Sequence, residues 1–115
     1  MTLAAAFTHL TADLSGVRAE YLRDRSLVGG LLIAAVAGAG LAPLSTPAVH
    51  ERADGGFTLV VLLEPGHIVV HTLPDRERLI ADMLTPADHD PGKAVDVFVR
   101  RLAPANVRSE RRAVG

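Results

Sequence analysis

The residues of this chain best suited to chemistry are two histidines, His67 and His71, within residues 64–75. An imidazole exchanges a proton near neutral pH, so either could act as an acid, a base or a ligand contact. On a strand the two would share a face with Val69, about 13 Å apart at the usual rise. That is too far for both to bind one metal ion, and a zinc site would need other ligands. The spacing therefore predicts that the two histidines do not form a metal site. For His71, a role as a polar residue of the core remains the alternative to a site role.

Three further polar residues could join a site. Asp82 alternates with Met83 and Leu84 in an apolar segment, which places it either in a cleft or facing solvent. Asp75 ends the histidine segment and could accept hydrogen bonds from a ribose or an amine, or lie in a surface turn. Thr58 begins an apolar segment, where a strand hydroxyl is usually structural. We take all three as candidate ligand contacts.

The elements that must position these residues follow a strand–helix–four-strand–helix–strand order. Apolar and β-branched runs bounded by turn residues predict the strands, and the Asp54-Gly55-Gly56 turn predicts a hairpin. Helices that return to an antiparallel sheet give an α+β two-layer sandwich, with two helices on one face. Because of its prolines, the second strand is expected at an edge. The predicted strands cover residues 4–14, 41–51, 57–63, 67–73, 79–84 and 106–114.

Both helices have recognisable starts and buried faces. Asp24 or Ser26 can cap the first, and Gly38 and Gly40 end it. Asp90 is expected to cap the second, with Pro91 in its first turn. Apolar spacing predicts the buried positions, which are Val28, Leu31, Leu32, Ala35 and Val36 in the first helix and Ala94, Val95, Phe98 and Leu102 in the second.

Composition narrows the class of protein. The 115 residues fit a single domain, 1–115, and the net charge of −1 argues against a nucleic-acid binder. The absence of cysteine excludes disulfides and a Cys nucleophile. Residues 26–50 carry no Asp, Glu, Lys or Arg, but their glycines and prolines favour a buried helix and strand over a membrane span. No signal peptide is recognisable, and we expect a cytoplasmic protein.

One segment of the sequence reads Glu64-Pro65-Gly66-His67-Ile68-Val69-Val70-His71-Thr72-Leu73-Pro74-Asp75. It resembles the E-S-H-x-x-x-H-T-W-P-E signature of bacterial and archaeal S-adenosylmethionine decarboxylases. The likeness extends to His9-Leu10-Thr11-Ala12-Asp13 and to Asp90-Pro91-Gly92-Lys93-Ala94, so it covers nearly the whole chain. It implies the fold of that polyamine-biosynthesis family, a homodimer, and S-adenosylmethionine or a related nucleoside as ligand.

The departures from the signature fall on the chemistry. In that family the chain cuts itself before the signature serine, which becomes a pyruvoyl group, and here that position is Gly66. The residue before it is Pro65, and Pro86 replaces the catalytic cysteine. Leu73 stands for the tryptophan, and Asp75 for the glutamate that holds the ribose. The resemblance therefore implies no pyruvoyl cofactor and no autocleavage.

By the same resemblance, His71 corresponds to the processing proton shuttle and Thr58 to a hydroxyl residue used in self-processing. We expect a non-decarboxylating homologue or regulatory subunit that binds S-adenosylmethionine through His67, His71, Asp75, Asp82 and Thr58, and that could pair with an active paralogue. One alternative is a repurposed enzyme that uses His71 and Asp75 for acid–base chemistry on a similar substrate. Another is a structural dimer without a ligand.

Overall fold

The computed structural model describes residues 4–115. Its elements follow the predicted order, with a short helix and a 3-10 turn added. The strands are β1 (Phe7–Ser15), β2 (Ala48–Glu51), β3 (Phe57–Leu63), β4 (Gly66–Leu73), β5 (Arg78–Pro86) and β6 (Asn106–Val114). The helices are α1 (Ala19–Leu22), α2 (Arg25–Gly38), α3 (Gly92–Leu102) and the 3-10 turn η1 (Pro74–Arg76).

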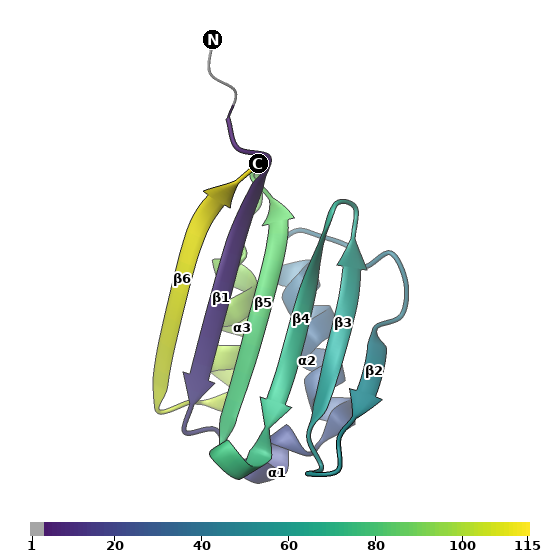
Figure 1. Cartoon of the computed structure of the whole chain (residues 1–115), viewed down its shortest axis with the longest axis vertical. Coiled ribbons are helices and arrows are strands. Elements are labelled where there is room, and N and C mark those ends of the chain that lie inside the picture. The colour runs from purple at the N-terminus through teal and green to yellow at the C-terminus, as the bar shows by residue number, and fades with distance from the viewer. Residues whose placement is uncertain (1–3) are drawn as a thin grey trace.

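All six strands form one antiparallel sheet in the order β2-β3-β4-β5-β1-β6. Strands β2 to β5 are consecutive neighbours, while the first and last strands of the chain pair with each other. Helices α2 and α3 cover one face of this sheet, and the opposite face carries no helix (Figure 1). We call the uncovered side the open face. The predicted α+β two-layer sandwich is confirmed.

Alternation along the strands decides which side chains reach the open face. In β3, Phe57, Leu59 and Val61 are buried under the helices, whereas Thr58 and Leu62 point the other way. The same alternation in β1, β4 and β5 turns the histidines and acidic residues outward, together with apolar side chains such as Val69 and Ile80, while Thr72 and Thr85 are buried. The sequence pattern therefore assigns one face of the sheet to the core and leaves the histidines and carboxylates of these strands on the other face.

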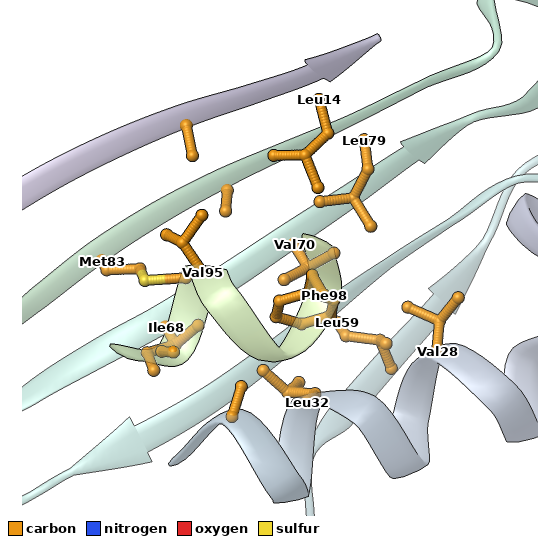
Figure 2. Close-up of a cluster of buried hydrophobic side chains, with 14 of the residues drawn as sticks. Leu14, Val28, Leu32, Leu59, Ile68, Val70, Leu79, Met83, Val95 and Phe98 are labelled. Atoms are coloured by element: carbon orange, nitrogen blue, oxygen red, sulfur yellow. The ribbon is translucent and has the colours of Figure 1, made fainter. Parts of the chain in front are cut away.

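Aliphatic side chains around two aromatic rings, Phe57 and Phe98, make up the core. Phe98 of α3 is 1% exposed and lies between the sheet and the buried residues of α2 (Figure 2). Val28 and Leu32 of α2 are fully buried beside it. Gly38 allows the helices to approach, because a Cβ atom there would lie 3.3 Å from a methyl group of Val97. This packing holds the sheet in register.

Some boundaries differ from the sequence prediction. The first strand begins at Phe7 rather than at residue 4, and the second covers only Ala48–Glu51, because Pro43 and Pro47 keep the preceding residues out of the ladder. Its edge position is confirmed. Helix α3 begins one residue later than predicted: Pro91 is the N-cap residue, and Asp90 accepts a hydrogen bond from Gly92 N–H at 2.9 Å.

The predicted cap of the first long helix is confirmed, since the Asp24 carboxylate accepts a hydrogen bond from Leu27 N–H at 3.0 Å. The predicted buried positions of both helices are confirmed as well, with Leu31 only partly buried. Among residues 4–115, no helix combines the length and apolar character that crossing a membrane requires.

Candidate functional site

The open face brings His9, His67 and Asp82 together from three strands. The Nε2 atoms of His9 and His67 lie 3.1 Å and 3.2 Å from the same oxygen, Oδ1 of Asp82. The strand register explains this meeting, because Leu84 of β5 is opposite both His9 in β1 and His67 in β4, and Asp82 precedes it by one side-chain repeat on the same face. We call these three residues the His–Asp–His cluster.

Opposing effects act on the Asp82 carboxyl group. Partial burial raises its pKa, but hydrogen bonds and electrostatic attraction from His9 and His67 outweigh this effect, so the pKa lies below its usual value. The carboxylate remains partly open to solvent, with 43% of its side chain exposed. The cluster therefore holds an ionised carboxylate between two imidazoles at neutral pH.

The lowered pKa of Asp82 has a consequence for acid stability. A carboxyl group whose pKa is lower folded than unfolded stabilises the fold above its unfolded pKa, and this contribution disappears as the pH falls through the folded pKa. We expect Asp82→Asn to be less stable than the wild type at pH 7, with the difference shrinking toward pH 3. After solvent screening the effect is about 0.5 kcal/mol or less. Urea unfolding at both pH values measures it.

The control is Asp96→Asn, the same exchange at an exposed α3 carboxylate that forms no ion pair within residues 4–115. The loss of stability caused by Asp96→Asn should differ less between pH 7 and pH 3 than the loss caused by Asp82→Asn. An Asp82→Asn penalty that grows as the solution becomes more acidic would contradict the assigned direction of the shift.

A second polar group lies on the same face between β3 and β4. Thr58 and His71 are directly opposite in the register, and Thr58 Oγ1 is 2.8 Å from His71 Nδ1. Arg52, in the hairpin before β3, donates from its guanidinium to Thr58 Oγ1 at 3.3 Å and to the carbonyl oxygen of Thr72. We call Arg52, Thr58 and His71 the Arg–Thr–His chain.

The predicted site residues thus fall into separate places. His67 joins Asp82, while His71 joins Thr58, so the two histidines share a face as predicted but have different partners. Asp75 lies in η1, which follows the C-terminal end of β4, whereas His67 lies near the N-terminal end of that strand. The Asp75 carboxylate forms an ion pair with Arg23 at 3.0 Å. Asp75 therefore makes no side-chain contact with the two histidine groups.

Sequence reasoning assigned no site role to His9 and did not single out Arg52. A signal for His9 is present in the alternation of β1, where His9, Thr11 and Asp13 occupy the polar face. No comparable signal exists for Arg52, because it lies in a turn and reaches its partners only through the fold of the hairpin.

The open face also has shallow hollows. One of about 680 Å³ is lined by Thr11, Asp13, Ile80 and residues of β6, and another of about 430 Å³ reaches His9 and Arg112. Both lie on the β6 side of the His–Asp–His cluster. No group of three or more His, Asp or Glu residues in the described part of the chain is arranged to hold a metal ion.

Gly66 begins β4 with a backbone φ of +119°, a conformation that essentially only glycine adopts. A Cβ atom added there would overlap the carbonyl oxygen of Leu84 and lie 3.1 Å from its carbonyl carbon. The backbones of β4 and β5 therefore leave no room for a side chain at this position.

Comparisons with known proteins agree with this architecture. A family profile described as S-adenosylmethionine decarboxylase matches residues 8–113. The S-adenosylmethionine decarboxylase proenzyme of Pyrobaculum islandicum is 30% identical over 102 residues, which cover 88% of this chain and 82% of that protein. The arginine decarboxylase proenzyme of Aeropyrum pernix is 30% identical over 84% of this chain and 74% of its own length.

A solved structure shows the same fold. The crystal structure of adenosylmethionine decarboxylase from Aquifex aeolicus superposes with a TM-score of 0.87 over 98% of this chain and 93% of its own, at 28% identity. With the profile match over nearly all of the sequence, these likenesses establish that the chain belongs to the S-adenosylmethionine decarboxylase family.

Proposed function

We propose that this chain binds S-adenosylmethionine or a related nucleoside without decarboxylating it, as a catalytically inactive homologue or as a subunit of an active decarboxylase. The observation that carries the proposal is Gly66. A pyruvoyl group forms from a serine, whose side chain supplies both the attacking oxygen and the carbons of the ketone. Glycine has neither, and a Cβ atom at this position would overlap the Leu84 carbonyl oxygen.

Other positions support the same conclusion. Pro86, the last residue of β5, has no side-chain proton to donate where the family signature has a cysteine. The Thr58–His71 pair remains intact, with a 2.8 Å contact and no serine to serve. The Thr58–His71 pair is therefore available to contact a ligand, although the chain has no serine at position 66 for self-processing.

We also propose that the chain forms a homodimer through its open face. Leu62 is 53% exposed there, and Val60, Val69 and Ile80 are only half-buried on the same side of the sheet. A small domain gains stability by covering such a face. Light scattering of the purified chain gives the mass that checks this assembly.

Calorimetry with S-adenosylmethionine, followed by mass spectrometry of the mixture, tests the proposed function. We expect binding, an unchanged ligand and a protein with the intact mass of one uncut chain. Arginine serves as the second ligand because one relative is an arginine decarboxylase proenzyme. A break before Gly66 with a pyruvoyl-sized end group would refute the proposal that the chain does not cleave itself. If no adenosine sulfonium binds, the proposed ligand is wrong.

The His–Asp–His cluster favours one second candidate, a repurposed enzyme. Two imidazoles on one carboxylate oxygen, at 3.1 Å and 3.2 Å, form an acid–base group that needs no cofactor. Release of methylthioadenosine or another fragment from S-adenosylmethionine would support this candidate, provided that His67→Gln abolishes the release.

A further inference from the structure

Arg52 is held in one place by the hairpin between β2 and β3. Its backbone N–H donates to the carbonyl oxygen of Gly56 at 2.8 Å, and its guanidinium forms an ion pair with Asp54 at 3.5 Å. Asp54 also accepts the Gly56 N–H at 2.8 Å, which closes the turn. The side chain is 28% exposed, so the guanidinium lies against the sheet rather than in bulk solvent.

The space for this guanidinium depends on Gly56. A Cβ atom there would lie 2.5 Å from the Thr72 carbonyl oxygen and 2.8 Å from Cδ of Pro74, and it would overlap the guanidinium itself. With no side chain at residue 56, Arg52 passes across the hairpin and donates to Thr72 O and to Thr58 Oγ1. Local backbone therefore aims the arginine at the Thr58 hydroxyl.

The donors and acceptors of the three groups favour one direction for their hydrogen bonds, although the Thr58 oxygen has a second lone pair that could accept from His71. A guanidinium only donates, so Thr58 Oγ1 accepts from Arg52. The single Thr58 proton is then free to be donated, and His71 Nδ1 is the acceptor at 2.8 Å. If Nδ1 carried the proton instead, the Thr58 hydroxyl would have no side-chain acceptor among residues 4–115.

We propose that Arg52 is a positioning residue that acts through Thr58 to keep neutral His71 in the tautomer with its proton on Nε2. Nδ1 is occupied as an acceptor, so the ring presents an N–H donor on the open face. Within residues 4–115, Nε2 of His71 makes no hydrogen bond. A donor fixed in this way suits an acceptor that carries negative charge, and a ligand carboxylate is such a group.

The surroundings agree with a carboxylate as the group bound. His50 of β2 is exposed and directly opposite Thr58 on the same face. The acidic groups near the Arg–Thr–His chain already have partners, because Asp54 pairs with Arg52 and Asp82 lies between His9 and His67. The assignment of the tautomer stands without a ligand, whereas the assignment of the carboxylate rests on the proposed function.

Long-range proton–nitrogen NMR spectra of the ring test the tautomer directly. At a pH where the imidazole is neutral, the wild type should show His71 with its proton on Nε2, the signals being assigned with His71→Gln. Arg52→Met and Thr58→Val should shift the ring toward a mixture of tautomers, while Thr58→Ser should restore the wild-type pattern. A wild-type ring protonated on Nδ1, or an unchanged ring in both variants, would overturn the proposal.

Two further measurements distinguish a loss of folding from a loss of ligand binding in the Arg52 variants. Backbone amide spectra that match the wild type away from the hairpin establish that Arg52→Met is folded, and Arg52→Lys keeps the charge but loses the forked geometry. We expect Arg52→Met to weaken S-adenosylmethionine binding about tenfold, while binding of decarboxylated S-adenosylmethionine, which lacks only the carboxylate, is unchanged. An equal loss for both ligands would overturn the carboxylate assignment.

If wild-type protein binds neither compound, the proposed function fails together with the carboxylate assignment. The NMR result still decides the tautomer in that case, because it is recorded without a ligand. Failure of the proposed function and failure of the Arg52 role are thereby distinguished.

Discussion

Gly66→Ala is expected to destabilise the protein by about 3 kcal/mol or more. The added methyl group would overlap the Leu84 carbonyl oxygen, and the φ of +119° is unfavourable for any residue with a Cβ atom. Backbone strain of this kind costs about 1–3 kcal/mol, and forcing an atom into a packed site costs about 1–3 kcal/mol more. Thermal unfolding should show a melting temperature lower by about 10 °C.

Gly29→Ala provides the matched control in α2. Its added Cβ atom would meet nothing within 4 Å, and alanine favours a helix over glycine by about 1 kcal/mol. The same substitution should therefore leave stability unchanged or raise it. A Gly66→Ala protein as stable as the wild type would mean that β4 and β5 can move apart at this point and that a serine side chain could be accommodated there.

Phe98→Ala is expected to cost about 3–5 kcal/mol of unfolding free energy. Phe98 is one of three phenylalanines in the chain, is 1% exposed, and fills the space between α3, α2 and the sheet (Figure 2). The surrounding core is made mostly of aliphatic side chains, and a core of this kind relaxes only partly into the cavity left behind. Urea unfolding followed by circular dichroism measures the loss.

Two variants bracket this result. Phe98→Leu leaves a smaller cavity and should cost clearly less than Phe98→Ala. Ile33→Ala removes an aliphatic side chain of α2 that is 41% exposed and should change stability by about 0.5 kcal/mol. Equal losses for Phe98→Leu and Phe98→Ala would show that ring shape rather than filled volume stabilises the interface between the layers.

The molecule separates its scaffold from its chemistry. The buried face of the sheet and the two helices carry the family fold, and the polar open face carries both histidine groups. Gly66 lies at the start of β4 and Pro86 at the end of β5.

The sequence by itself determined the fold class, the order of the elements and both limits of two strands. Strands β3 and β6 begin and end at the predicted residues, because alternation and turn residues are local signals within one segment. The histidine segment 64–75 also indicated the family without any structural information. Boundaries shifted where neighbouring signals conflicted, as at Pro43 and Pro47 before β2.

Only the tertiary structure decided which polar residues meet. His9 and Asp82 are separated by 73 positions and come together because β1 and β5 pair in one particular register. Arg52 reaches Thr58 through the shape of a hairpin, and the Gly66 backbone lies against Leu84 through the pairing of β4 with β5. Strand register is set by the summed packing of the whole sheet on α2 and α3, so no single segment encodes it.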